Sequence, residues 1–224
     1  MTINKQIIYS LVLLFITIIL FGVSDLDIYI QNMFYDFKQN TWILDRNMEP
    51  WKFIFYDGMK RFLLIIALSF LLVLIFFRNH HRLKKYKNGI LLIVLASIFI
   101  PSIIGGLKKV TNMPCPKNEI YYLGNMPKIA VWERYTEPYK SMTHISCWPA
   151  GHASGGFVLL SFFFLFITNR NKILALVVGL SVGWSMGIYK MLIGDHYLSH
   201  TIITMIISWI CILLIHTMIS REMH

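Results

Sequence analysis

The chain has 224 residues, of which 56% are hydrophobic and 14% are charged. This composition excludes a disordered chain, and it is more apolar than that of a soluble globular domain. The formal net charge of +10 would suit binding to nucleic acid, but many basic residues lie in short segments between apolar runs, where membrane topology places them. We therefore expect one membrane-embedded domain over residues 1–224, with the bilayer as its partner and no nucleic acid.

Six apolar runs approach the roughly 20 residues that a helix needs to cross the hydrocarbon core of a bilayer. The fourth run is short, so its span should begin inside the segment from Cys147 to Ser154. Six spans place both chain termini on the same side of the membrane. The sequence thus predicts an all-α, polytopic membrane protein with six transmembrane helices, near residues 7–23, 62–77, 90–107, 155–168, 173–193 and 197–219.

The charges of the loops predict the orientation. The loop from Arg78 to Lys87 has basic residues and no acidic one, and Arg170 and Lys172 lie in the next loop on that side. Positive charge in short loops marks the cytoplasmic side, so we expect both termini to be cytoplasmic. The two long loops, near residues 24–61 and 108–146, should then face outward.

Aromatic residues that favour the headgroup region gather in these two outer loops. Within the first loop, the segment from Trp51 to Arg61 mixes apolar and charged residues. It suits a helix lying along the membrane interface, and an ordinary hydrated loop is the alternative. The aromatic residues are Trp42, Trp51, Tyr56, Tyr121, Tyr122, Trp132 and Trp148.

Polar clusters occur at three span ends. Residues 105–116 close the third span, residues 147–156 open the fourth, and residues 189–200 join the fifth to the sixth. Ionisable groups inside a membrane are costly and usually have a function. With the orientation above, all three clusters fall on the outer side, which favours one shared site.

The residue types in these clusters suit phosphoryl transfer. Lys108 and Lys190 would hold phosphate oxygens, and backbone amides from Gly151 to Gly156, at the start of a helix, would bind an anion. One histidine would attack phosphorus and another would protonate the leaving oxygen, because histidine exchanges protons at neutral pH. Each residue alone has a simpler explanation, such as a lysine at the membrane interface or His152 as a helix cap. Their occurrence together favours a catalytic site over these simpler explanations.

The spacing of these residues resembles the signature of the type 2 phosphatidic acid phosphatase superfamily of membrane lipid phosphatases. That signature reads K-x-x-x-x-x-x-R-P, then P-S-G-H, then S-R-x-x-x-x-x-H-x-x-x-D. The corresponding segments here are Lys108 to Pro116, Pro149 to His152, and Tyr189 to His200, with every spacing intact. The pattern is most similar to a bacterial subgroup that resembles lipid A and undecaprenyl-diphosphate phosphatases.

The resemblance implies a role for each matching residue. His196 would be the nucleophile that forms a phosphohistidine, and His152 would be the general acid. Lys108 and Lys190 would hold the phosphate. We expect no cofactor. The predicted function is removal of phosphate from a lipid-linked phosphate or diphosphate at the periplasmic face of a bacterial inner membrane. A lipid phosphotransferase and a catalytically weak lipid-binding relative are the alternatives.

Four positions depart from the signature. Cys115 replaces arginine, Ala150 replaces serine, Tyr189-Lys190 replaces Ser-Arg, and His200 replaces aspartate. Cysteine cannot make the bidentate contact that arginine makes with phosphate, and a lysine ammonium lacks the planar fork. At position 150 the backbone amides of Ala150 and Gly151 can still donate to phosphate.

Three further expectations concern side chains around the site. Arg134, beside Glu133, could supply the missing guanidinium, but we favour the alternative that it forms a surface ion pair. Cys115 and Cys147 should form a disulfide, since both lie on the oxidising side, and two free thiols are the alternative. His200 should act with His196. A zinc site of His152, His196 and His200 is a further alternative, although the nearby lysines would repel a metal dication, so we expect no metal.

Overall fold

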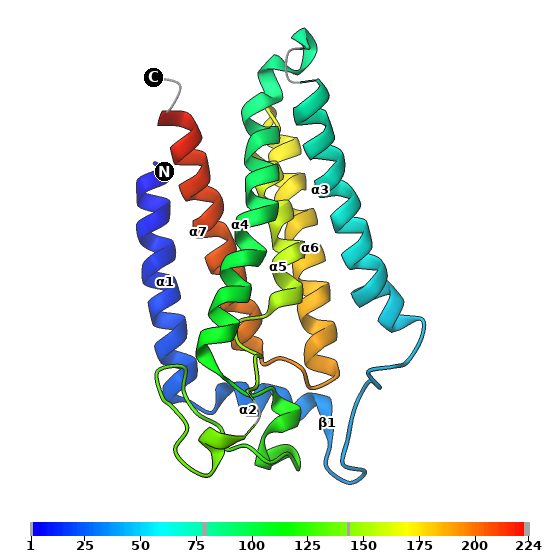
Figure 1. Cartoon of the computed structure of the whole chain (residues 1–224), viewed down its shortest axis with the longest axis vertical. Helices are drawn as coiled ribbons and strands as arrows, with labels where there is room; N and C mark the ends of the chain where they lie inside the picture. The colour runs from blue at the N-terminus through cyan, green and yellow to red at the C-terminus, as the bar shows by residue number, and fades with distance from the viewer. Residues whose placement is uncertain (1, 78–79, 143, 222–224) are drawn as a thin grey trace.

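Helices that run side by side make up most of the chain (Figure 1). The computed structural model describes residues 2–77, 80–142 and 144–221, so Arg78 of the basic loop lies outside the described residues. Within this part, five helices are long and apolar enough to cross a membrane. They are α1 (Ile3–Val23), α3 (Gly58–Phe76), α4 (Lys87–Thr111), α6 (Asn169–Leu192) and α7 (Leu198–Arg221). The chain is therefore an all-α, polytopic membrane protein.

The fourth expected span is shorter than the others. Helix α5 (Gly151–Phe157) continues as the 3-10 helix η7 (Val158–Phe164), and together they form an apolar segment from Gly151 to Phe164. This segment begins inside residues 147–154, as predicted, but it has fewer than the roughly 20 residues of a complete α-helical span. A 3-10 helix rises about 2 Å per residue, which extends the reach of η7. The count of six transmembrane helices is not confirmed.

The core lies where α4, α5 and α7 meet. One face of α4 buries Leu92, Ala96, Ile100 and Ile104, which recur every four residues as one side of an α-helix requires. They form one cluster with side chains of α5, η7 and α7 that includes Phe157. Helix α3 buries none of its residues, and both α1 and α3 leave many large apolar side chains exposed, as lipid-facing helices do.

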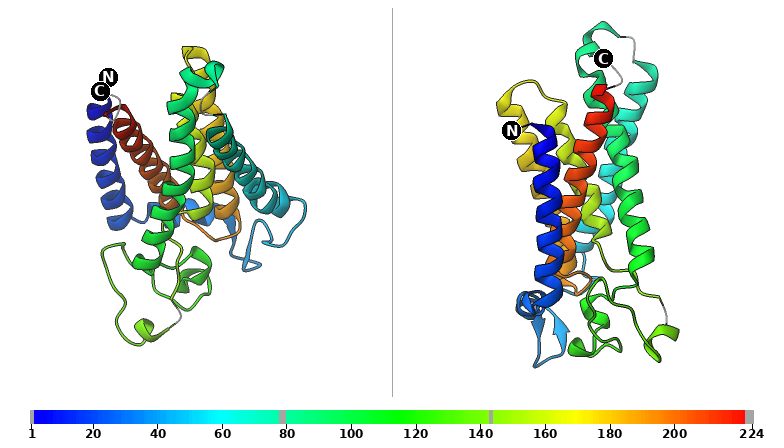
Figure 2. Two further views of the ribbon diagram at one scale, coloured as in Figure 1. Left: turned by 45° about the horizontal axis from the view of Figure 1, so that its top comes forward. Right: turned by 90° about the vertical axis from the view of Figure 1, so that its left-hand side faces the viewer.

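Helix α1 lies beside α7, as Figures 1 and 2 both show. Both termini lie at the same end of the bundle, together with the 3-10 turn η3 (His81–Tyr86) between α3 and α4. The opposite end carries the two long loops. These loops hold α2 (Leu26–Gln31), the strands β1 (Tyr35–Asp36) and β2 (Thr41–Trp42), and the short 3-10 turns η1 (Asn32–Phe34), η4 (Pro116–Asn118), η5 (Ile120–Tyr122) and η6 (Tyr139–Ser141).

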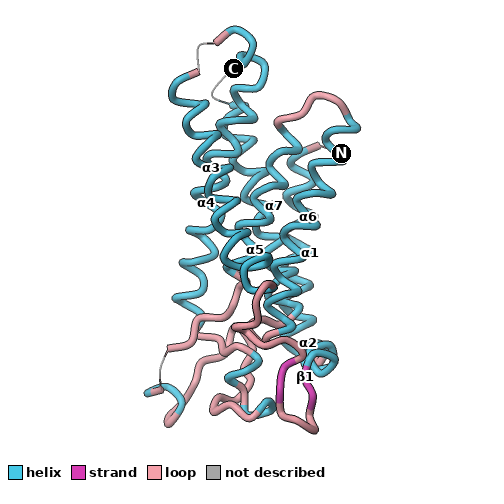
Figure 3. Tube along the Cα trace, turned by 90° about the vertical axis from the view of Figure 1, so that its right-hand side faces the viewer, coloured by secondary structure: helices cyan, strands magenta, loops and turns pink. Residues whose placement is uncertain are grey.

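The two strands form a small antiparallel hairpin at the loop end of the bundle (Figure 3). Tyr35 pairs with Trp42, and their rings pack edge to face with centroids 4.8 Å apart. The segment from Trp51 onward is helical rather than an irregular loop. Its π-helical turn η2 (Phe53–Asp57) continues directly into α3, so it is not a separate interfacial helix.

Helices α5 and α6 approach closely because glycines line their contact. A Cβ atom on Gly156 of α5 would lie only 2.6 Å from the Cα atom of Gly183 on α6. Gly179 and Gly187 lie one helical turn on either side of Gly183 and meet Leu160 and Thr201 at similarly short range. Small residues four apart allow such backbone contact between membrane helices. This contact fixes α5, which carries His152 in its first turn, against α6, which carries Lys190 in its last turn.

Candidate active site

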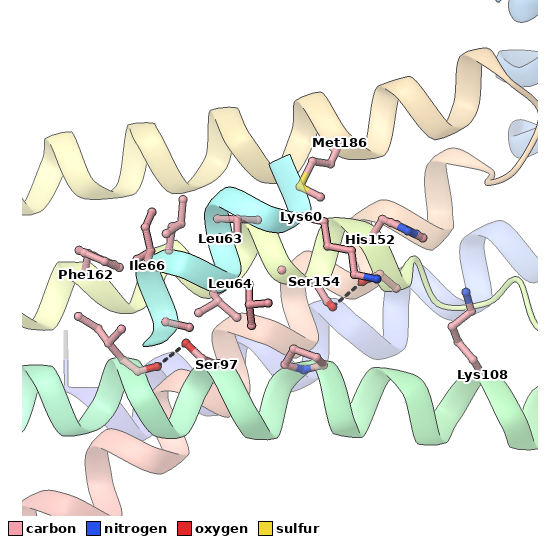
Figure 4. Close-up of a pocket in the computed structure, with 17 residues that line it drawn as sticks. Lys60, Leu63, Leu64, Ile66, Ser97, Lys108, His152, Ser154, Phe162 and Met186 are labelled. Atoms are coloured by element: carbon pink, nitrogen blue, oxygen red, sulfur yellow. Dashed lines mark hydrogen bonds between the residues drawn. The ribbon is translucent and has the colours of Figure 1, made fainter. Parts of the chain in front are cut away.

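The three polar clusters meet at the loop end of the bundle. Lys108 lies in the last turn of α4, and its Nζ atom is 3.5 Å from the position that a Cβ atom on Gly151 would occupy. Gly151 begins α5 and is followed by His152. Figure 4 shows Lys108 and His152 near the same end of a pocket between α3, α4 and α5. The structure thus brings together side chains that are more than forty positions apart in the sequence.

Ala150 joins the second cluster to the third. Its backbone N–H donates to the Thr204 hydroxyl at 2.8 Å and lies 3.3 Å from the His200 carbonyl oxygen, and the residue is completely buried. The N–H group is therefore engaged within the protein and is not a free donor for phosphate. Ala150 fixes the start of α5 against α7, while Gly151 faces Lys108.

His196 and His200 form a pair in which one Nδ1 atom lies 3.3 Å from the other. The His200 ring also bonds to the backbone carbonyl of Cys147. A carbonyl only accepts, and a neutral imidazole has one N–H and one acceptor nitrogen. In the tautomer where the Nδ1 of His200 accepts from the Nδ1–H of His196, the N–H of His200 is on Nε2 and the lone pair of His196 is on Nε2.

His196 is buried, with 3% of its surface exposed. Burial, together with the neighbouring His200 and the Lys108 and Lys190 ammonium groups, lowers the pKa of His196 well below its usual value. The imidazole is therefore neutral at neutral pH. A neutral imidazole with a free Nε2 lone pair is the form in which histidine acts as a nucleophile.

A buried carboxylate precedes His196 and was missed by the motif comparison. Asp195 is bonded to Lys190 at 2.8 Å, to Lys117 at 2.7 Å and to Arg46 at 3.3 Å. Burial would raise the pKa of Asp195, but the charge of Lys190 and the bonds to Lys117 outweigh burial, and the pKa lies below its usual value. Three cations thus converge on one carboxylate beside His196. The sequence contained a signal for Asp195, because it is an acidic residue at a span end and lies directly before the candidate histidine.

Arg46, which the sequence did not single out, contributes a guanidinium to this cluster, whereas a contact of Arg134 with phosphate stays a prediction. Arg134 is exposed in the second outer loop, and among the described residues no ion pair or hydrogen bond joins it to the histidines or to the site lysines. The guanidinium that reaches the site comes from the first outer loop, through the pair between Arg46 and Asp195.

Tyr56 is a second residue that sequence reasoning did not assign to the site. It comes from η2, and its ring stacks on the His152 ring with centroids 4.3 Å apart. The Nζ atom of Lys190 lies 4.1 Å from the centre of the same ring, within range of a cation–π contact. Tyr56 therefore lies between the expected general acid and one of the expected phosphate ligands.

Cys115 and Cys147 are joined by a disulfide, with their Cα atoms 5.2 Å apart. The bridge connects the segment after α4 with the segment before α5. Because the carbonyl of Cys147 bonds to His200, the bridge also holds the acceptor that orients the histidine pair. Cys211 is a free, buried thiol in α7.

The zinc alternative requires three imidazoles aimed at one point. Among the residues that the structure describes, no group of three or more His, Cys, Asp or Glu side chains is arranged to hold a metal ion. The Nδ1 atoms of His196 and His200 instead face each other at hydrogen-bonding distance.

An apolar groove of about 460 Å³ leads away from His152 along α5. Lys60 and Lys108 lie at its polar end, and Phe162 lies at its far end between the helices (Figure 4). The walls come from α3, α4 and α5 with η7, and most of their side chains are apolar. The shape suits a molecule with a charged end beside His152 and an apolar tail in the groove.

The fold and this site define a membrane phosphatase. Residues 88–224, well over half of the chain, match the family model of the PAP2 superfamily. The chain belongs to the PAP2 superfamily, and membership makes it a phosphatase-type enzyme, a phosphoric ester hydrolase. The matched region contains all three polar clusters, whereas α1, α2 and α3 precede it. No curated protein and no solved structure matches the chain.

Proposed function

We propose that the protein removes phosphate from a lipid-linked phosphate or diphosphate through a phosphohistidine on His196. Undecaprenyl diphosphate, lipid A and phospholipids are the candidate substrates. The observation that carries the proposal is the neutral His196, with its Nε2 lone pair free, in one cluster with His152, Lys108 and Lys190. The apolar groove that begins at His152 supports a lipid as the substrate, since the tail would remain in an apolar environment.

The first chemical step forms the phosphohistidine. The Nε2 atom of His196 attacks phosphorus, and the bond from phosphorus to the leaving oxygen breaks. The electron pair stays on that oxygen, which takes a proton from His152. Lys108 and Lys190 hold the phosphate oxygens on which negative charge develops.

The second step releases phosphate. His152, now neutral, takes a proton from a water molecule, whose oxygen attacks the phosphorus of the phosphohistidine. The bond between phosphorus and Nε2 breaks, and its electron pair returns to His196. Inorganic phosphate leaves, and both histidines regain their starting protonation.

We also propose that the site faces the periplasm of a bacterial inner membrane and that both termini are cytoplasmic. The termini lie at one end of the bundle with η3, which contains Lys84 and Lys85, and the site lies at the other end (Figure 1). Basic loops favour the cytoplasmic side, which supports this orientation.

Replacement of His196 tests the proposed reaction. His196→Ala should abolish phosphate release, and it should also abolish labelling of the protein by a substrate with radioactive phosphate. His152→Ala should slow most the substrates with poor leaving groups, because the acid only protonates the departing oxygen. His80→Ala, at the other end of the bundle, is the matched control. Wild-type turnover by His196→Ala would exclude the assignment. Phosphate recovered on a second lipid instead of in water would identify a phosphotransferase.

A further inference from the structure

A second, smaller pocket of about 160 Å³ lies beside the catalytic cluster. Its walls come from the first outer loop, from η2 and from the end of α6. Tyr56 belongs to these walls, while its ring stacks on His152, which borders the apolar groove. We name this cavity the Lys52 pocket; it is lined by Arg46, Asn47, Lys52, Tyr56, Tyr189, Lys190 and Ile193.

The Lys52 pocket is strongly cationic. Arg46, Lys52 and Lys190 are among its seven lining residues, and none of the seven is acidic. Asp195 binds Arg46 and Lys190 without being a lining residue, so it fixes the two cations and neutralises only one of the three charges. Among the described residues, Lys52 has no ion pair.

The nearest acid in the sequence of this loop makes no ion pair with Lys52 among the described residues. Glu49 accepts a hydrogen bond from the backbone N–H of Phe53 at 3.1 Å, which keeps its carboxylate at the helix start. An anion bound among these three cations would gain charge-assisted hydrogen bonds from them. The charge pattern therefore predicts an anionic ligand.

The volume fits one phosphate group. The cavity of about 160 Å³ exceeds the space of about 30 Å³ that a water molecule takes in the liquid, so a phosphate group can enter it. Asn47 and Tyr56, whose side chains can donate hydrogen bonds, also line the cavity.

We propose that the Lys52 pocket binds a second phosphate group, next to the one that reacts. The inference rests on the proposed function for its link to catalysis, because Lys190 lines the pocket and is also expected to hold the reacting phosphate. The ligand is either the non-reacting phosphate of a lipid diphosphate or inorganic phosphate on its way out of the site. Both sources present the same tetrahedral dianion to Arg46, Lys52 and Lys190.

Binding of inorganic phosphate to the purified full-length protein tests the site without turnover. Equilibrium dialysis with radioactive phosphate should show that Lys52→Gln raises the dissociation constant of one site about tenfold, the effect of losing one charge-assisted hydrogen bond at a half-exposed position. Lys52→Arg should restore it. Lys38→Gln, an exposed lysine in the turn between β1 and β2, should bind as wild type does. Equal binding by Lys52→Gln and Lys38→Gln would overturn the proposal.

Turnover then distinguishes the two sources of phosphate. If the ligand belongs to a diphosphate lipid, Lys52→Gln should lower kcat/KM for lipid diphosphate about tenfold more than for lipid monophosphate. If the ligand is the released product, the inhibition constant of inorganic phosphate should rise about tenfold with both substrates. A protein without any turnover that still shows Lys52-dependent binding would contradict the proposed function and support the site.

Discussion

At the scale of single residues, the central feature is the pair of histidines at the positions where the signature discussed above has histidine and aspartate. His200 can accept a hydrogen bond from His196 when its own N–H is used by the backbone of Cys147. The chain from His196 through His200 to Cys147 would then select one tautomer of His196. A neutral acceptor supplies this orientation, but it does not stabilise positive charge that develops on His196.

This arrangement predicts the behaviour of two substitutions at His200. His200→Ala removes the acceptor and should lower kcat by about 100-fold, because Nδ1–H of His196 loses its partner and the productive tautomer is no longer selected. His200→Asp restores an acceptor and adds negative charge, so its kcat should equal or exceed that of wild type. Steady-state kinetics with one lipid phosphate measures both.

Rescue of kcat by His200→Asp would show that His200→Ala is slow because His196 has lost its hydrogen-bond acceptor, and not because the protein is misfolded. Both variants should keep the thermal midpoint of the wild type to within a few degrees, as measured by differential scanning fluorimetry in detergent. If His200→Asp is as slow as His200→Ala while both remain folded, the pair does not act through a hydrogen-bond acceptor.

The site residues that the sequence predicted follow a local spacing, whereas those it missed reach the site through contacts between distant segments. Lys108, His152 and His196 were found because each lies at a fixed distance from a helix end and keeps a recognisable spacing. Arg46 and Tyr56 were missed because they reach the site from the first outer loop, about a hundred or more positions away from the residues they contact. No periodicity or local motif encodes such contacts between loops.

At the scale of elements, the contact between α5 and α6 positions the site. It places His152, at the start of one helix, near Lys190, at the end of the other, with Tyr56 between them. The apolar runs predicted that both helices exist. They could not predict the closeness of this pair, because glycine in a membrane helix is compatible with several neighbours.

Gly156→Ala tests the importance of this closeness. The new Cβ atom would lie 2.6 Å from the Cα atom of Gly183, so one backbone must move. Overpacking of this kind costs about 1–3 kcal/mol, and displacement of α5 should also lower kcat. The matched control is Gly106→Ala in α4, where a Cβ atom meets nothing within 4 Å and stability should be unchanged or slightly higher.

Thermal midpoints of the two variants, measured in the same detergent, provide the comparison. A loss of stability in Gly156→Ala alone is expected. Equal midpoints for Gly156→Ala and Gly106→Ala would show that α5 and α6 are free to separate.

At the scale of the whole molecule, the part outside the family match contributes to the site. Asp27 of α2 accepts both the backbone N–H of Ser199 at 3.0 Å and the hydroxyl of Ser199. Arg46 pairs with Asp195, and Tyr56 contacts His152. We therefore infer that residues 1–224 act as one domain, since the N-terminal segment contacts the start of α7, Asp195 and His152.

Two buried carboxyl groups bond to residues that closely follow His196 in the sequence, and they link the stability of the molecule to pH. Asp27 binds Ser199, and Glu119 accepts a hydrogen bond from the Tyr197 hydroxyl at 2.7 Å. Burial raises the pKa of Asp27 to about 6 and that of Glu119 to about 7, although these bonds oppose part of the rise. Both groups hold a proton in the folded protein at a pH where they have lost it in the unfolded chain.

The sign of the pH dependence follows from the raised values. Below about pH 4 both states are protonated and the contribution to stability is complete; as the pH rises towards 7 the unfolded chain loses its protons first, so stability falls. For Glu119 this loss is on the order of 3 kcal/mol.

The thermal midpoint of wild type should therefore fall between pH 4.5 and 8 more steeply than that of Glu119→Gln, which no longer titrates at this position. Glu137→Gln, in the same loop but exposed, should follow wild type. Parallel curves for wild type and Glu119→Gln would mean that Glu119 is ionised in the folded protein throughout this range, and that its bond to Tyr197 is made by a carboxylate.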